Sequence, residues 1–212
     1  MEKDSFKIKR NICYASFLEP GVLTEERVKN IFNDFVTKKC KGAVVVIGSE
    51  VTAIEKFAFY KCLTLTSVEI QEGLTSIGDG GFYTCRNLKS ITLPNSLTEI
   101  GEAAFNECYA LEEISLPKGI KELKAWALAC CVLIKQLTLP EELTFIGYRC
   151  FNSVFRLEKI IIPKSVTTIE KWAFENCKAL TICCEAEEKP DGWEKEWNHS
   201  NCPVEWGWKK EG

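Results

Sequence analysis

The chain has a single histidine, His199, and therefore little of the chemistry that catalytic and metal sites commonly use. A zinc site would need four converging thiolates, which the repeats described below spread along a line. A Cys–His nucleophile would need a thiol within reach of His199, and only Cys202 or the last strand could supply it. The glycines of Gly78-Asp-Gly80-Gly81 lie in a repeat turn, so they predict no phosphate-binding loop. We therefore predict no catalytic residue, no metal site, no cofactor and no enzyme activity.

The sequence also lacks an excess of charge of one sign and any long apolar run. Its 27 basic and 30 acidic residues give a net charge of −3, which does not predict nucleic-acid binding. No apolar stretch approaches the ~18 residues of a membrane helix, so we predict no membrane insertion. The first residues, MEKDSFKIKRNICYASF, lack the apolar segment of a signal peptide. From the printed residues we expect no export signal, although a trimmed precursor would look the same.

What the chain does contain is a pattern that recurs every 23 residues. It runs from Ile91 as ITLPNSLTEIGEAAFNECYALEE and from Ile114 as ISLPKGIKELKAWALACCVLIKQ, and it continues to Ile160. The same frame extends backward to a degenerate copy at Val45. A fixed period of this length is typical of a solenoid, in which each repeat buries its apolar side against its neighbours. We predict one α/β solenoid domain.

Each repeat begins with a short strand, as in Leu88-Lys-Ser-Ile91-Thr-Leu93. The alternation places Ile91 and Leu93 on the buried face, with Ser90 and Thr92 on the opposite face. Stacked repeats then form a parallel β-sheet of about seven short strands. The strands are centred on Val45, Val68, Ile91, Ile114, Leu137, Ile160 and Cys183.

The rest of the repeat returns the chain to the next strand. Proline at 94, 117, 140 and 163 lacks an amide donor and ends the strand. Phe105, Cys108 and Leu111 then follow at intervals of three, which predicts a short helical turn on the outer side. Phenylalanine recurs at this core position in all but one repeat, which has Leu128. Each such column should fill one slot of a continuous core.

The twelve cysteines suggest disulfides or a metal, but their spacing favours a structural role. One repeat position holds Cys62, Cys85, Cys108, Cys131 and Cys177. Val154 occupies the same position, so the slot is apolar, and a free cysteine behaves as a small buried hydrophobe. Parallel side chains in register also hold their Cβ atoms too far apart for easy bridging.

Two other sets of cysteines differ from this column. Cys130 belongs to a column of mostly polar residues and is predicted to point to solvent. Cys202 could pair with Cys183 or Cys184, and a free thiol packed in the same place is equally consistent with the sequence.

We interpret residues 43–184 as repeats, residues 1–42 as an N-terminal cap and residues 185–212 as a C-terminal cap, because a solenoid must cover its apolar ends. Thr24 is the predicted N-cap of a helix in the first cap. Its apolar stripe comprises Val28, Ile31, Phe32, Phe35 and Val36.

The helix is expected to cover the first repeat, including Val44 and Val46, which are apolar although they face away from the core. The alternative is that the stripe binds a partner helix.

Tryptophans crowd the C-terminal cap at Trp193, Trp197, Trp206 and Trp208. They are predicted to plug the last repeat, and a carbohydrate or ligand site is the alternative interpretation. The segment Pro203-Val-Glu-Trp206 could add a last strand to the sheet.

These residues resemble the bacterial leucine-rich repeats of the BspA-like, or Treponema-type, class. The pattern of that class is close to L-x-x-I-x-L-P-x-x-L-x-x-I-G-x-x-A-F-x-x-C, and the tail from Cys184 to Trp206 also looks like the terminal segment of such proteins. The resemblance implies a curved, right-handed leucine-rich repeat superhelix with a role in protein binding. Members are often surface proteins or adhesins of bacteria and some protists, which implies a surface or secreted location.

Strand residues that face away from the core form a polar surface that we predict to be concave. Charges alternate along one of its columns, which suits cross-strand pairing of Glu112, Lys135 and Glu158. Ile161 and Ile182 are predicted to be neighbours in a small apolar patch at its C-terminal end. The predicted protein-binding residues are Lys89, Ser90, Thr92, Glu112, Glu113, Ser115, Lys135, Gln136, Thr138, Glu158, Lys159, Ile161 and Ile182.

The leading hypothesis is a monomeric, non-enzymatic scaffold that engages a protein partner through this face, as an adhesin-like bacterial surface module. The alternative is a structural spacer within a larger surface protein, with no binding role of its own.

Overall fold

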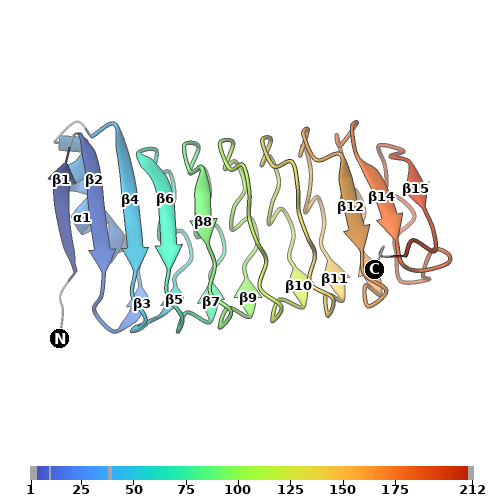
Figure 1. Ribbon diagram of the computed structural model, residues 1–212, viewed down its shortest axis with the longest axis horizontal. Coiled ribbons are helices and arrows are strands. Elements are labelled where there is room, and N and C mark those ends of the chain that lie inside the picture. Colours follow the sequence, from blue (N-terminus) through green and yellow to red (C-terminus); the bar gives the residue numbers. More distant parts are fainter. Residues whose placement is uncertain (1–3, 10, 38–39, 210–212) are drawn as a thin grey trace.

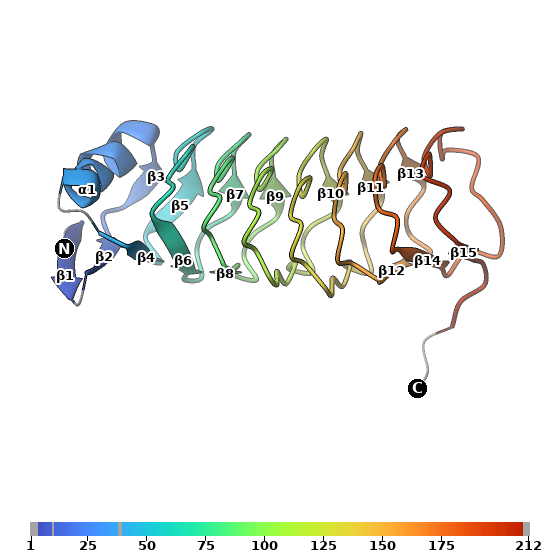
Figure 2. The ribbon, with the colours of Figure 1, turned by 90° about the horizontal axis from the view of Figure 1, so that it is seen from above.

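A computed structural model describes residues 4–9, 11–37 and 40–209, without the side chains of residues 33–37. The chain is a β-solenoid whose turns follow one another along the long axis (Figure 1). The strands β2, β4, β6, β8, β12 and β14 lie along one side of the solenoid, and the chain returns along the other side (Figure 2). The fold class predicted from the 23-residue period is therefore confirmed.

These strands form the front face, which begins with a five-stranded sheet in the order β1-β2-β4-β6-β8. β1 runs antiparallel to β2, and the other neighbours pair in parallel. The bounds are β1 Ser5–Lys9, β2 Ile12–Phe17, β4 Gly42–Ile47, β6 Leu65–Ile70 and β8 Ser90–Thr92. At the other end the face continues as β12 Lys159–Ile162, β14 Thr181–Cys184 and β15 Val204–Glu205.

Two of the seven strands predicted for the front face are not hydrogen-bonded strands. The segment around Ile114 keeps only an isolated bridge between Ser90 and Glu113, and the segment around Leu137 is not a strand. Both Ile114 and Leu137 nevertheless remain buried. The packing of these side chains, rather than a hydrogen-bonded ladder, holds the two segments in line.

A second row of short parallel strands lies on the return path, where the sequence indicated only an apolar pair. One sheet contains β3 Gly21–Leu23, β5 Val51–Ile54, β7 Ser76–Ile77 and β9 Glu99–Ile100. A second contains β10 Glu122–Leu123, β11 Phe145–Ile146 and β13 Thr168–Ile169. Each of these strands ends on a buried apolar residue. That residue packs in the core, and its backbone pairs with the neighbouring short strand.

The segment after each short strand, here called the turn edge, lies opposite the front face (Figure 2). The predicted helical turn is wrong there. Cys108 N donates to Phe105 O over 3.2 Å in a single turn, and Ala103 and Glu107 adopt left-handed φ angles of 50° and 59°. A left-handed residue cannot continue a right-handed helix. Alternate amides instead donate to the next repeat, as Phe105 N does to Ala127 O over 2.9 Å.

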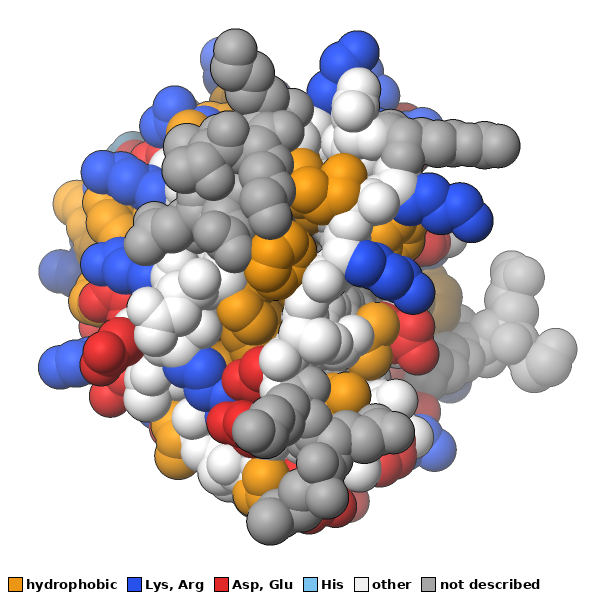
Figure 3. All heavy atoms as spheres, turned by 90° about the vertical axis from the view of Figure 1, so that its left-hand side faces the viewer, with side chains coloured by type: hydrophobic (Ala, Val, Ile, Leu, Met, Phe, Trp, Pro, Cys, Tyr) orange, Lys and Arg blue, Asp and Glu red, His pale blue; other side chains and the backbone are white. Residues whose placement is uncertain are grey.

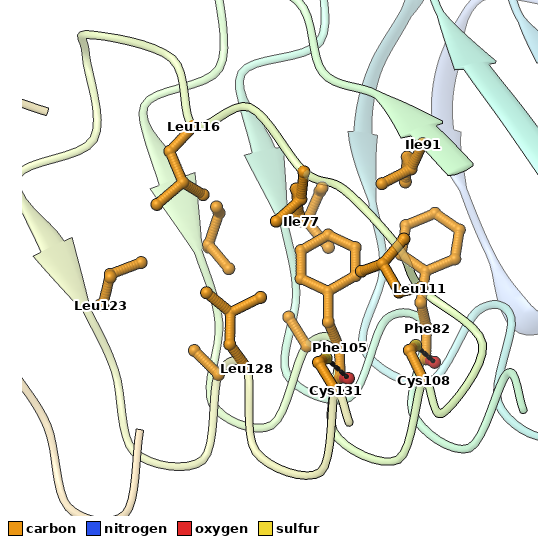
Figure 4. Packing of buried hydrophobic residues seen from close by; sticks show 14 of the residues in the cluster. Ile77, Phe82, Ile91, Phe105, Cys108, Leu111, Leu116, Leu123, Leu128 and Cys131 are labelled. Carbon is orange, nitrogen blue, oxygen red and sulfur yellow. Dashed lines mark hydrogen bonds between the residues drawn. The ribbon is translucent and has the colours of Figure 1, made fainter. Parts of the chain in front are cut away.

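The buried columns pack as the repeats predict (Figure 4). The rings of Phe59 and Phe82 stack with centroids 4.8 Å apart, and those of Phe82 and Phe105 follow at 5.5 Å. Leu128 interrupts this stack, and Phe151 and Phe174 resume it at 5.3 Å. Stacked aromatic pairs add to the burial of apolar surface, so the column joins neighbouring repeats.

The column cysteines also fill the core, and they add a contact that the pattern did not indicate. Cys85, Cys108 and Cys131 are fully buried, and Val154 in the same column is only 1 % exposed. The Cys108 thiol donates to Phe82 O over 3.3 Å, and the Cys131 thiol reaches the carbonyl of Phe105 over the same distance (Figure 4). Each thiol therefore satisfies a carbonyl of the preceding repeat as well as filling an apolar slot.

The N-terminal segment builds a further turn of the solenoid, which the degenerate sequence obscured. Its helix, α1, spans Glu25–Thr37, and the Thr24 hydroxyl accepts a hydrogen bond from Arg27 N over 3.1 Å, as predicted for an N-cap. Val28 and Phe32 are buried, and the Phe32 ring meets Phe59 edge-on. The side chains at 35 and 36, which the stripe also included, lie outside the described ones.

The helix does not cover Val44 and Val46, so that prediction was wrong. α1 lies beside β3, on the side opposite the front strands (Figure 2). Val44 and Val46 instead lie half-buried on the front face, where they pair with Tyr14 and Ser16 of the unpredicted strand β2. Hydrophobic side chains remain visible at this end of the molecule between polar and charged ones (Figure 3).

One disulfide, between Cys13 and Cys40, joins β2 to the segment before β4, with the two Cα atoms 6.1 Å apart. The repeat pattern did not indicate it, because both cysteines precede the repeats. The other ten cysteines are free. Cys202 is therefore not paired with Cys183 or Cys184, and its thiol donates to Cys177 O over 3.2 Å.

The C-terminal segment packs on the last repeat through two tryptophans. Trp193 and Trp197 are buried, and Trp193 Nε1 donates to Val166 O over 3.1 Å. The Trp197 ring meets Phe174 edge-on at 5.9 Å and so prolongs the phenylalanine column. Strand β15 pairs in parallel with β14, as the sequence suggested for this segment.

Candidate functional site

The front face brings most of the predicted binding residues together around two adjoining depressions. The first, of about 480 Å³, is lined by Lys89, Ser90, Glu112, Glu113, Lys135 and Gln136. The second, of about 530 Å³, includes Thr92, Ser115 and Thr138 and shares Glu113 and Gln136 with the first. Nine of the thirteen predicted residues thus line one continuous surface.

The buried residues of the same segments position these side chains. Ile91, Ile114 and Leu137 point into the core, so their immediate neighbours face outward. Ser67 Oγ and Ser90 Oγ lie 3.1 Å apart on neighbouring strands, which places one hydroxyl pair at the N-terminal border of the first depression. The core therefore fixes the direction of each residue on the face, whatever its identity.

The predicted cross-strand ion pairs are not formed. Lys89, Glu112, Lys135 and Glu158 are all exposed, and none of them takes part in an ion pair within the described residues. Exposed pairs gain little Coulomb energy in water and lose side-chain entropy, which explains the absence. The charges of this column are free to meet a partner.

The C-terminal end of the face differs from the prediction. Glu158 and Lys159 are exposed and Ile161 is half-buried, but Ile182 is fully buried. In the ladder, Ile160 pairs with Ile182 and Ile161 pairs with Cys183.

The predicted apolar patch of Ile161 and Ile182 is therefore wrong. Leu180-Thr-Ile182 is one residue shorter than Leu157-Glu-Lys-Ile160, and a shift of one residue moves a side chain to the other face. The C-terminal tail reaches this part of the face, since Lys159 Nζ lies 4.9 Å from the centre of the Trp208 ring.

The remaining chemistry of the described residues is limited. They contain no group of three or more histidine, cysteine or acidic side chains placed to hold a metal ion. Burial raises the pKa of Cys62, Cys177 and Cys184 to about 12, so these thiols stay protonated at neutral pH. No helix in this part of the chain is both long and apolar enough to cross a bilayer.

A third hollow lies on the turn edge, where the sequence predicted no site. Phe57, Tyr83 and Trp126 line it, with Gly80 and Ala103 between them. The signal was present in the repeats, since one turn column has the small residues Gly80 and Ala103 between the aromatic residues Phe57 and Trp126. It became readable only once the turn geometry showed that this column faces outward.

The repeats match the family model described as the BspA type Leucine rich repeat region, in six copies over residues 52–181. The chain belongs to this family. The resemblance inferred from the proline, Ala-Phe and cysteine columns is thereby confirmed. A comparison with curated proteins finds no match.

Solved bacterial structures share the fold. A leucine-rich repeat protein of T. pallidum is 24% identical with a TM-score of 0.65, over 84% of this chain and 78% of that one. A leucine rich cell surface protein of Faecalibacterium prausnitzii is 27% identical with a TM-score of 0.68, over 89% of this chain. A leucine-rich repeat protein of Bacteroides ovatus is 21% identical with a TM-score of 0.55. This chain spans about half the length of the last two, 55% and 53%.

Proposed function

We propose that this repeat scaffold is a non-enzymatic module that binds a protein partner through its front face. The observation that carries the proposal is the pair of adjoining depressions, whose rim holds charges of both signs that form no ion pair among the described residues. The buried core fixes the backbone that carries these side chains, so little backbone entropy is lost on binding. Charges of both signs give specificity, because a wrong partner meets like charge.

The likeness to the Faecalibacterium prausnitzii protein supports a place at the cell surface or outside the cell, because that relative is described as a leucine rich cell surface protein. The second candidate function is a structural spacer within a larger surface protein. The half-length match to two of the relatives favours it as an alternative, because a module of a longer chain need not bind by itself.

A charge-reversal variant separates the two functions. Lys89→Glu, Glu113→Lys, Lys135→Glu and Glu158→Lys together leave the net charge unchanged while reversing three of the four charges that line the depressions and that of Glu158 in the next repeat. The matched control reverses two lysines and two glutamates that are exposed away from this face, Lys56, Lys121, Glu122 and Glu142. We expect the front-face variant to lose proteins that the wild type and the control both enrich from cell-surface extracts.

A photo-reactive residue at Gln136, which lines both depressions, identifies the partner directly, with the same residue at Glu142 as the control. Cross-links from position 136 alone would support binding by the front face. If neither position yields a cross-link and both charge variants capture the wild-type set, the spacer function is favoured instead.

A further inference from the structure

The hollow on the turn edge has a volume of about 500 Å³ and is separate from the front face. Phe57, Tyr83 and Trp126 contribute aromatic surface to it. Phe57 is 42 % exposed although it is a large apolar side chain. Its ring also lies 5.7 Å from that of Tyr60, which stacks in turn on Tyr83 at 5.4 Å. One wall of the hollow is therefore an aromatic cluster that faces solvent.

The hollow exists because two small residues interrupt a column of large ones. The left-handed turn position is held by Phe57, Gly80, Ala103, Trp126 and Arg149 in successive repeats. A Cβ atom on Gly80 would lie 2.4 Å from a carbon of the Phe57 ring, so that ring leans over the glycine backbone. Gly80 and Ala103 together leave open the space that a side chain fills in later repeats.

The rim of the hollow is acidic. Asp79, Glu102 and Glu107 line it, and the described lining residues include no lysine or arginine. Arg86 lies outside the lining and pairs with Glu107 over 2.9 Å, which offsets one of the three charges. Asp79 Oδ1 accepts a hydrogen bond from Glu102 N over 2.8 Å, so its carboxylate is held in place. Lys124 pairs with Glu99 over 2.6 Å and lies within electrostatic reach of Asp79, but it does not line the hollow. The hollow thus combines aromatic surface with an acidic lining.

A later repeat shows which group occupies a similar combination of aromatic rings and a carboxylate in the same turn column. In the next repeats, the guanidinium of Arg149 lies 5.0 Å from the Trp126 ring centre, 5.3 Å from that of Tyr148 and 4.7 Å from that of Trp172. Arg149 Nε also lies 2.8 Å from a carboxylate oxygen of Glu175. A planar cation is attracted to aromatic faces and pairs with a carboxylate. Trp126 contacts this filled position and also lines the open one.

We propose that the hollow between Phe57 and Trp126 binds an arginine side chain supplied by a partner polypeptide. The guanidinium would take the place that Arg149 occupies in its own repeat, between aromatic rings and beside the carboxylates of Asp79 and Glu102. This site is independent of the front face, so it gives the scaffold a second point of contact with a basic segment of a partner.

The test uses the full chain, labelled with ¹⁵N and titrated with N-acetyl-arginine amide. We expect the amide signals of Glu102, Ala103 and Asn106 and the Trp126 indole signal to shift, with a dissociation constant on the order of 10 mM. N-acetyl-citrulline amide has the same shape without the charge, and it should bind at least about tenfold more weakly. Cellobiose serves as the probe for a carbohydrate site on the same aromatic surface.

Two variants assign the binding to the hollow. Ala103→Arg should fill it and abolish the shifts, and it should be tolerated because Arg149 adopts nearly the same left-handed φ, 52° against 50°. Gln136→Arg on the front face is its control. Glu102→Gln with Glu107→Gln should weaken binding severalfold, whereas Glu112→Gln with Glu113→Gln should not.

Equal binding of citrulline amide, stronger shifts with cellobiose, or no shift at these residues would each overturn the proposal. If Ala103→Arg fails to fold, as judged by circular dichroism, the glutamine pairs decide the outcome. The front-face charge-reversal variant should bind arginine amide like the wild type, so failure of either site is distinguishable from failure of the other.

Discussion

Buried and exposed positions recur in this solenoid with the same spacing but differ in how strictly the residue type is kept. The core position after the short strand is phenylalanine in five repeats and leucine in one. On the front face, the column of Lys89, Glu112, Lys135 and Glu158 changes sign at every step. A buried side chain must fit the repeats above and below it, whereas an exposed one meets only water. The core therefore constrains the repeat, and the faces are free to acquire partners.

Phe105→Ala should give the largest effect, because the ring is fully buried and stacks on Phe82. We expect a loss of about 3–5 kcal/mol in the free energy of unfolding, measured by urea denaturation. Thr92→Ala on the front face is the matched control and should change stability by less than about 0.5 kcal/mol. Similar losses for the two variants would contradict the distinction between the columns.

Cys108 tests whether its column is chiefly apolar or chiefly hydrogen-bonded. Cys108→Val should cost about 1 kcal/mol or less, because Val154 occupies the equivalent position. Cys108→Ser should cost about 1–3 kcal/mol, because it places a smaller, more polar group in an apolar slot. If serine is tolerated better than valine in the same denaturation experiment, the bond to Phe82 O matters more than the burial.

Cys130 and Cys131 are adjacent in the chain but belong to different columns. Cys130 is half-buried and lines the turn-edge hollow, whereas Cys131 is fully buried. Iodoacetamide should therefore modify Cys130 first, as mass spectrometry of the folded protein would show. Modification of Cys131 before Cys130 would contradict the assignment of Cys131, rather than Cys130, to the buried column.

The rate at Cys130 should also depend on pH. Burial raises the pKa of Cys130, and the nearby Glu107 carboxylate raises it further. Only the thiolate reacts, so the rate should increase as pH rises toward this elevated pKa. Glu107→Gln should lower the pKa and speed the reaction at pH 8, with Glu112→Gln as the control. A rate that does not change with pH would show that access, rather than ionisation, limits the reaction.

The smallest effect on stability is expected for the front-face charge reversal. Its four residues are exposed and form no ion pair within the described residues, so the free energy of unfolding should change by less than about 0.5 kcal/mol. A loss of partner binding in this variant would then reflect the surface itself. A marked loss of stability would instead mean that the face contributes to folding.

Much of the fold could be predicted from the sequence, because a constant period makes equivalent positions share one environment. Phe105, Cys108 and Ile91 were each assigned to the core by comparison with other repeats. The comparison failed where the period changes. One residue is missing after Leu180, so Ile182 is buried rather than exposed. The N-terminal segment shows no clear repeat, and strands β1 and β2 were not foreseen.

The 23-residue pattern alone was enough to predict the solenoid, its core columns and the direction of most front-face residues, because alternation along each strand decides which side chains are buried. The folded chain was needed to show which segments form hydrogen-bonded strands, on which side α1 lies, and that Cys13 joins Cys40. It also showed that Gly80 and Ala103 leave a hollow beside Trp126. These features depend on distances between turns, and a linear pattern does not contain those distances.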